Sequence, residues 1–343
     1  MLAANLGGGV LKPSLKLVGL VLLVTAGIGG WEFARYRNAT QKPLPNSTSI
    51  EFEIQAGESL ASVARRLQLR GLVEKGWWFE LLAFHRLAAT KIKAGEYEIK
   101  PGMTLEEVLE LFVAGKVKQH RITLVEGWTV SQVLAALKAH PAVRFTLEGV
   151  PLEKLLSELG LPPGHPEGQF FPDTYFFVRG TEDKELLRRA WKRMQAVLAE
   201  EWSQRTQGLP FNTAYEALVL ASIVEKETGR EEERAKIAGV FVRRMQKNMR
   251  LESDPTVIYG MGEAYQGDIR AQDLREDTLY NTYLHAGLPP TPIALPGRAA
   301  IHAVLHPAAG EELYFVAKGD GSHAFSVTLH EHKQKVDRYQ RQP

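Results

Sequence analysis

Hydrophobic residues recur at intervals of three and four along residues 217–228, ALVLASIVEKET. This spacing predicts one helix with an apolar face that ends in a carboxylate. The residues on that face are Leu220, Ile223, Val224 and Glu227. Glu225 lies about 200° around the helix from Glu227, so the two acids are expected on different faces. Of the two, Glu227 is predicted to continue the buried side.

Two interpretations of Glu227 follow from this pattern. A carboxyl group held against apolar side chains has its charged form disfavoured, so its pKa rises and it can act as a general acid at neutral pH. Alternatively, the Glu-Lys-Glu segment is a solvent-exposed helix end, or Glu227 pairs with Arg243 or Arg244. Carboxylates near helix ends are common, so the pattern alone favours the second interpretation.

A second strong hydrophobic signal lies near the N-terminus, where residues 17–31 carry no charge. As a helix these residues would span roughly 22 Å, less than the ~30 Å hydrocarbon core of a membrane. Extension to 15–34 gives about the 20 residues required, with Trp31 at the interface. The sequence predicts one membrane-spanning helix. A cleaved signal peptide with Lys12 and Lys16 as its basic region is the alternative, and the flanking charges nearly balance, so they do not set the orientation.

A glycine-turn pattern then occurs three times. Each copy has glycine, any residue, serine or threonine, an aliphatic residue, two further residues and valine; the copies are 57–63, 102–108 and 127–133. Thr104 with Glu107, and Thr129 with Gln132, are capping boxes that begin helices. Short strands are expected before the copies, at 49–54, 95–99 and 121–125. The sequence therefore predicts strand–turn–helix units.

Residues 49–118 of this region resemble a LysM-like module, which implies glycan binding. A folded spacer without glycan affinity is the alternative, because the pattern is also a general helix start. Three aromatic residues, Trp77, Trp78 and Phe79, lie on a helix predicted at 75–87. Such clusters more often belong to the core than stack on sugars, and we expect core positions.

The remaining pattern predicts an α+β fold that is rich in helices, with small antiparallel strands. Helices are predicted at 152–159, 183–203, 231–248 and 297–305, and strands at 175–179, 313–317 and 324–328. The predicted organisation is a cytoplasmic tail and transmembrane helix (1–37), a proline-containing linker (38–48), the LysM-like module (49–118), a connecting α/β subdomain (119–166) and a catalytic domain (167–343).

Composition narrows the possible chemistry. The 343-residue chain is 44% hydrophobic and has a net charge of +2 with interleaved signs, so no basic face indicates nucleic acid. It contains no cysteine, which excludes disulfides and thiolate chemistry. His330 and His332 are two residues apart, which is wrong for one helical face. His323 precedes a predicted strand and could contact substrate, but a solvent-facing or core position is favoured. We expect no metal and no cofactor.

Five motifs in order along the chain carry a family resemblance. They are 167–175 (EGQFFPDTY), 221–228 (ASIVEKET), 253–260 (SDPTVIYG), 280–283 (YNTY) and 287–290 (GLPP). Together they resemble the YceG-like family of endolytic murein transglycosylases. The resemblance implies an enzyme held in the plasma membrane by one helix, with its catalytic domain facing the periplasm or cell wall. It also implies cleavage of the β-1,4 bond between N-acetylmuramic acid and N-acetylglucosamine in nascent peptidoglycan strands, 1,6-anhydro-muramyl ends, termination of strand elongation, and contact with peptidoglycan synthases.

The catalytic glutamate of that family falls on Glu227, the acid that the helix pattern had already marked. One carboxyl group suffices for such a reaction, because it can protonate the leaving oxygen and then take the proton of the muramyl C6 hydroxyl. The residues expected to bind substrate are Ser253, Asp254, Tyr259, Tyr280, Asn281 and Tyr283, with mere loop packing as their alternative role.

Two other function classes remain open. A hydrolytic muramidase would need a second acid; the candidates are Asp254, Asp173 and Glu252, although the first two adjoin prolines and are interpreted as turns. A glycan-binding scaffold of cell-wall synthesis with a vestigial cleft would need none. The intact motifs disfavour the scaffold, and the reaction products would separate transglycosylase from hydrolase.

Overall fold

The computed structural model describes residues 15–340, so residues 1–14 of the predicted tail, Lys12 included, lie outside the description. The described residues form two compact units, which meet between Gln119 and His120. Most of the predicted helices and strands are present, and the fold is α+β with more helix than strand, as expected.

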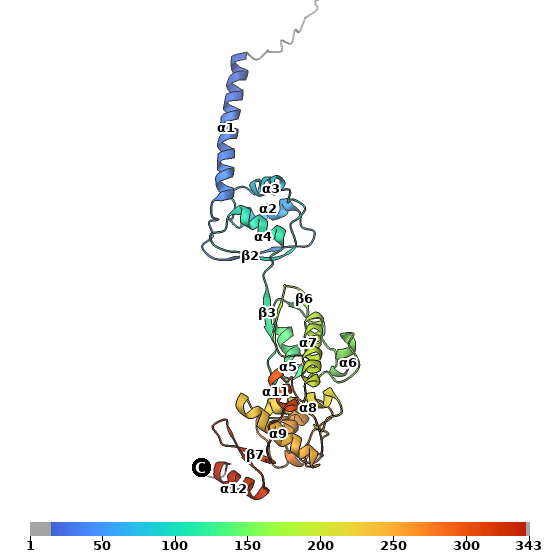
Figure 1. The fold of residues 1–343 in the computed structure, drawn as a ribbon. Helices are drawn as coiled ribbons and strands as arrows, with labels where there is room; N and C mark the ends of the chain where they lie inside the picture. The colour runs from blue at the N-terminus through green and yellow to red at the C-terminus, as the bar shows by residue number, and fades with distance from the viewer. Residues whose placement is uncertain (1–14, 341–343) are drawn as a thin grey trace, which may run out of the picture. The chain divides into compact units, whose positions relative to one another are not determined.

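The first unit is a small α/β unit that follows a long helix (Figure 1). Its elements are α1 (Leu15–Gln41), β1 (Ile50–Ile54), α2 (Leu60–Leu69), α3 (Gly76–His85), β2 (Gly95–Ile99) and α4 (Leu105–Ala114). Strands β1 and β2 pair antiparallel with Phe52 opposite Tyr97. Both rings pack on Phe112 of α4, at centroid distances of 5.7 and 4.8 Å. Trp78 and Phe79 are fully buried, as predicted, whereas Trp77 is 47% exposed.

Helix α1 has an apolar portion and a packed C-terminal end. From Val18 onward it is long and apolar enough to cross a membrane by length and composition, a property that a signal sequence would share. It continues through Gln41 into the predicted linker. Tyr36 and Leu44 are buried in the core of the first unit, and the Leu44 amide donates to the Met103 carbonyl at 2.8 Å. The prediction of an extended spacer at 38–48 is therefore wrong in part. Its first residues are helical, and Tyr36 before it and Leu44 within it pack into the core of the first unit.

This packing changes where the chain should tolerate truncation. A chain beginning at Glu32 is expected to keep a folded first unit, whereas one beginning at Ser49 loses Tyr36 and Leu44 from the core. Burial of each large apolar side chain stabilises by about 1.5–3 kcal/mol, so the shorter chain should unfold at lower denaturant concentration. Urea unfolding of the two chains measures this. Equal midpoints would show that the end of α1 adds nothing to the core.

The second unit contains the other elements. They are β3 (His120–Thr123), α5 (Val130–Ala139), β4 (Val143–Arg144), α6 (Leu152–Glu158), β5 (Thr174–Phe177), β6 (Thr181–Glu182), α7 (Asp183–Ser203), α8 (Ala214–Glu227), α9 (Glu231–Gln246), α10 (Asp254–Met261), two 3₁₀ turns (Gly262–Ala264 and Asp273–Arg275), α11 (Arg298–Leu305), β7 (Tyr314–Ala317), β8 (His323–Ser326) and α12 (Leu329–Gln340). The pairs β3–β5 and β7–β8 are antiparallel, whereas β4–β6 is parallel, unlike the purely antiparallel expectation.

Helix α7 joins two hydrophobic cores of this unit. Its first half contributes Leu187 to a core with β3, α5 and α6, and its second half contributes Met194 to a core with α8, α9 and α11. Strand β3 pairs with β5. The predicted border between residues 166 and 167 thus falls inside one compact unit.

Helix α8 is the centre of the second core, among α7, α9 and α11 (Figure 1). Every residue from Ala217 to Val224 is buried. The sequence predicted one buried face, but this part of the helix is buried on all sides. The small side chains of Ala221 and Ser222 allow neighbouring segments to cover the other faces. The first three residues and the last turn of α8 are only partly covered.

Capping chemistry explains the helix starts. Thr104 and Thr129 form the two predicted capping boxes, and Thr213 accepts from the Glu216 amide to begin α8. The predicted turn at Asp254-Pro255 is wrong, because these residues open α10. Proline is favoured in the first turn of a helix, where its missing amide hydrogen costs nothing.

Candidate active site

Glu227 is the last residue of α8, and the local sequence accounts for this. Thr228 adopts an extended conformation and ends the helix, and its hydroxyl accepts from the Arg230 amide at 3.0 Å. Threonine and glycine are both weak helix formers, so the helix stops where Gly229 follows. The Glu227 side chain is half-buried at this end, in a position to reach both protein and solvent.

A buried serine holds the Glu227 carboxylate. Ser253 donates its hydroxyl hydrogen to Glu227 Oε1. Ser253 is itself fixed, because its amide donates to Thr282 Oγ1 at 3.0 Å and Thr256 Oγ1 contacts the same hydroxyl at 2.9 Å. The sequence interpretation of an ion pair between Glu227 and an arginine does not hold.

The two arginines considered there have other partners. Arg243 pairs with Glu312 at 3.2 Å, and Arg244 pairs with Glu252 at 2.9 Å. Among the described residues, the hydrogen-bond donor that contacts the Glu227 carboxylate is therefore a neutral hydroxyl.

These surroundings set the protonation of Glu227. Burial raises the pKa of Glu227 to about 7; the hydrogen bond from Ser253 opposes the rise, and the negative charge of Asp254 adds to it. A helix C-terminus also disfavours a negative charge. Glu227 can therefore carry a proton near neutral pH, as a general acid requires.

Glu227 opens into a cavity of about 350 Å³ in the second unit. Its other walls come from Arg244 of α9, the loop before α10, Tyr283, strands β7 and β8, and helix α12. Its polar lining residues are Glu227, Arg244, Glu252, Asp254, Tyr283, Tyr314, His323, His332 and Gln340. The cavity combines carboxylates, two phenols and imidazoles, which suits a ligand rich in hydroxyl and amide groups.

Glu225 has a separate and structural environment. Its side chain is 6% exposed and lies 3.7 Å from Arg234, and it accepts from the Gly297 amide at 2.9 Å. Burial raises its pKa as well. The two acids do face different surroundings, but the prediction that only Glu227 lies on a buried side was wrong, because the segment around Gly297 covers the other side of α8.

Of the residues predicted to bind substrate, the structure brings Ser253, Asp254 and Tyr283 together at Glu227. Tyr283 donates its phenolic hydrogen to Asp254 Oδ1 at 2.6 Å, and both residues line the cavity. Ser253 contacts the acid itself. Glu252 lines the same cavity.

Tyr259, Tyr280 and Asn281 are not among the residues that line this cavity in the described part of the chain. The Tyr259 and Tyr280 rings pack edge to face at 4.8 Å. The Asn281 amide is fully buried and donates to the carbonyls of Leu274 and Glu276. In this structure, these three residues shape the loop that carries Tyr283.

A second buried acid, Glu167, contacts Tyr259 of helix α10. Its carboxylate accepts from the Val130 amide at 3.0 Å and from the Tyr259 hydroxyl at 3.1 Å. Burial raises the pKa of Glu167 to about 7. In the sequence, Glu167 stood out only as the first residue of a motif, and no role was predicted for it.

The C-terminal elements supply a wall of which the sequence offered only His323, as the less favoured interpretation of that residue. Tyr314 of β7 lies between the Arg244 guanidinium, 4.9 Å from its ring centroid, and the His332 ring, 5.2 Å away. His323 opens β8, contacts Glu233 at 2.7 Å and lines the cavity. These residues lie far from Glu227 in sequence, and no local pattern marks them.

Comparison with known proteins places the chain in a family. The profile of the YceG-like family matches residues 52–338, and the chain belongs to that family. It is 28% identical over 86% of its length to an endolytic murein transglycosylase of Bacillus subtilis, and covers 86% of that protein. It is 27% identical over 87% of its length to an endolytic murein transglycosylase of Streptococcus pneumoniae, and covers 60% of that longer protein. A crystal structure of a YceG-like protein from Listeria monocytogenes matches with a TM-score of 0.51 and 28% identity, over 84% of this chain and 100% of the other.

Proposed function

We propose that the protein is a peptidoglycan lytic transglycosylase in which Glu227 is the single catalytic acid and base. The observation that carries this proposal is a half-buried carboxyl group with a pKa of about 7, hydrogen-bonded to Ser253 at the edge of a cavity. The names of the Bacillus and Streptococcus relatives support the same activity.

In the proposed reaction, protonated Glu227 donates its proton to the glycosidic oxygen that leaves with N-acetylglucosamine. The bond from that oxygen to C1 of N-acetylmuramic acid breaks, and positive charge develops at C1. The Glu227 carboxylate then takes the proton of the muramyl C6 hydroxyl, whose oxygen bonds to C1 and closes a 1,6-anhydro ring. The proton returns to Glu227, so the carboxyl group is regenerated and no water is consumed.

The neighbouring residues have matching roles in this proposal. The Ser253 hydroxyl orients the carboxyl group and stabilises its charged form between the two steps. Asp254 keeps the pKa of Glu227 high and holds Tyr283 at the cavity. Tyr259, Tyr280 and Asn281 act by fixing the loop that presents Tyr283.

A hydrolytic muramidase is the second candidate, because Asp254 lines the same cavity as Glu227 and could activate water. Mass spectrometry of the products of purified glycan strands separates the two. We expect anhydro-muramyl ends, which are one water lighter than reducing ends. Reducing ends would instead establish the hydrolase, and uncut strands that still bind would establish a scaffold.

We also propose a cellular arrangement for this activity. Helix α1 anchors the chain in the plasma membrane, and the second unit faces the cell wall, where it cuts nascent strands and terminates their elongation beside peptidoglycan synthases. Residues 49–118 act as a LysM-like module. Two features support this role: the helix-opening turns at Gly57 and Gly102, which have positive φ, and the exposed ring of Trp77.

Ser253→Ala should move the alkaline limit of activity upward. The serine hydroxyl favours the charged form of Glu227, so its loss raises the pKa further and Glu227 keeps its proton to higher pH. A hydrogen bond to a charged group contributes about 1.5–3 kcal/mol, which corresponds to a shift of roughly one to two pH units. The pH profile of kcat/KM measures the shift, with the exposed Ser131→Ala as the control. An unchanged or lower limit in Ser253→Ala would contradict the assigned hydrogen bond.

A further inference from the structure

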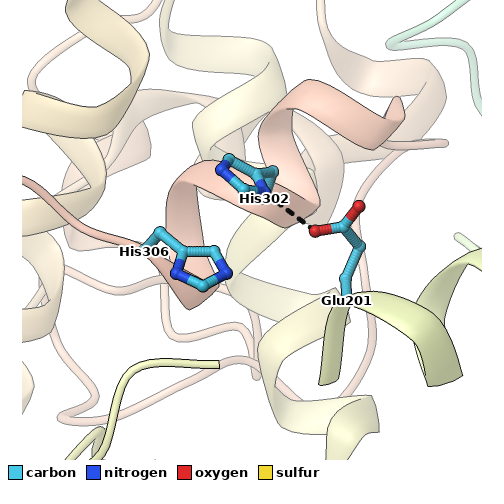
Figure 2. Close-up of side chains that lie close together, drawn as sticks. All are labelled: Glu201, His302 and His306. Atoms are coloured by element: carbon cyan, nitrogen blue, oxygen red, sulfur yellow. Dashed lines mark hydrogen bonds and ion pairs between the residues drawn. The ribbon is translucent and has the colours of Figure 1, made fainter. Parts of the chain in front are cut away.

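Three side chains with metal-binding chemistry converge where α7 meets α11. Glu201 comes from the last turn of α7, His302 from α11, and His306 from the residue that ends α11. One potential ligand atom from each lies within 4.8 Å of the other two. Figure 2 shows the two imidazole rings and the carboxylate grouped on one side of α11.

The backbone holds this cluster in place. His302 and His306 are four residues apart, the spacing that puts two side chains of a helix next to each other, and their ring centroids are 4.4 Å apart. Helix α7 packs against α11, and the Thr206 amide donates to the Leu305 carbonyl at 3.0 Å. The distance between the carboxylate and the rings is therefore set by packed main chain.

The contacts of the three groups fit metal ligation. Glu201 is 6% exposed, and its Oε2 lies 2.8 Å from His302 Nδ1, so both atoms already face one point. Arg298 lies 3.5 Å from the other carboxylate oxygen, Oε1, where it would hold the carboxylate in place. His306 Nδ1 lies 3.5 Å from Thr206 Oγ1, which leaves its Nε2 for a metal. A second hydrogen bond of this kind is the usual support for a ligating imidazole.

We propose that Glu201, His302 and His306 form a binding site for one divalent first-row transition metal ion, and that this ion is zinc. Two imidazoles and one carboxylate form a known zinc ligand set, with a fourth position open to water. The metal takes the place of the proton shared between Glu201 and His302. None of the three residues is among those lining the Glu227 cavity, so the site is independent of the proposed reaction.

The position suggests a structural consequence. Helix α11 packs on α8, the helix that ends at Glu227, and on α7 and α9. A metal bound by α7 and α11 would link two helices of this core. From the sequence we expect no metal, and the proposed site departs from that prediction. Glu201 and His302 are 101 residues apart, and no spacing motif in the sequence marks them as a pair.

The test is a zinc titration of the full-length chain in detergent, without a histidine tag, by isothermal calorimetry. We expect one Zn²⁺ per chain and a higher melting temperature with zinc than with EDTA. His306→Gln should weaken zinc binding by more than about tenfold, since loss of even an outer-shell partner weakens metal sites by about 10- to 100-fold. His302→Gln should act likewise, and the exposed His85→Gln in the first unit should bind zinc as the parent does.

Two further measurements decide the interpretation. His302 is 59% exposed, so His302→Gln should melt at the parent temperature in EDTA, which shows that its loss of binding is not unfolding. Bound Co²⁺ should show the intense visible bands of a four-coordinate site. Absence of stoichiometric binding by the parent, or zinc binding that is equal in the parent, His302→Gln and His306→Gln, would overturn the proposal.

Discussion

Glu227→Gln is expected to abolish peptidoglycan cleavage while the fold persists. Glutamine keeps the volume of the side chain and can still accept from Ser253, but it cannot donate and retrieve a proton. General acid–base catalysis contributes about two to four orders of magnitude, so the rate of glycan release should fall by about 10²- to 10⁴-fold. The assay is release of soluble fragments from purified sacculi.

The matched control is Glu225→Gln, two residues earlier on the same helix. Its amide oxygen can still accept from the Gly297 amide, so activity should stay within a few fold of the parent. It should be less stable, because it leaves the buried Arg234 without its acidic neighbour. An active Glu227→Gln beside an inactive but folded Glu225→Gln would show that the catalytic acid had been misassigned.

Glu227→Gln should also change how the stability of the fold depends on pH. The pKa of Glu227 is raised from 4.5 to about 7 on folding, so the neutral form contributes stability that is present below pH 4.5 and lost as the pH rises through 7. Glu227→Gln removes this dependence. Relative to the parent, the variant should gain up to about 3 kcal/mol in unfolding free energy between about pH 4 and pH 8. A difference that does not grow with pH would contradict the raised pKa.

Gly168→Ala is expected to destabilise the second unit strongly. Gly168 has φ of +75°, and a Cβ there would lie 2.4 Å from Cβ of Pro292. The left-handed backbone costs an alanine about 1–2 kcal/mol, and overpacking adds about 1–3 kcal/mol. A loss of about 2–5 kcal/mol in urea unfolding should therefore result. Activity should fall too, because the adjacent Glu167 supports Tyr259.

Gly208→Ala separates the two causes. Gly208 has nearly the same backbone, with φ of +76°, but nothing lies within 4 Å of the place that a Cβ would occupy. Its alanine variant should lose only the backbone contribution of about 1–2 kcal/mol. Equal losses in both variants would show that Pro292 moves aside without cost.

Local chemistry made much of the fold predictable. The capping boxes at Thr104 and Thr129 need only residues three positions apart, and both formed. The end of α8 was also predictable, because Thr228 and Gly229 follow the acid directly. Burial of Glu225 was not, since it depends on the Gly297 segment.

The site was predictable only where its motif residues contact one another. Ser253 contacts Glu227 although the two are 26 residues apart in sequence. The family resemblance, and no spacing rule, predicted that they belong to one site. The wall formed by Tyr314, His323 and His332 depends on how the C-terminal hairpin and helix pack on the second core. Packing of this kind joins distant segments and leaves no periodic pattern in either.

The cavity wall from α12 also has a consequence for the order in which the molecule becomes active. Glu227 is synthesised before much of its cavity, because the lining includes residues as late as Gln340. At about 5–20 residues per second, synthesis of the intervening segment takes on the order of 5–20 s. During that interval a nascent chain carries the acid without the surface that would hold a glycan against it. The cavity is therefore complete only after the C-terminal helix has been made.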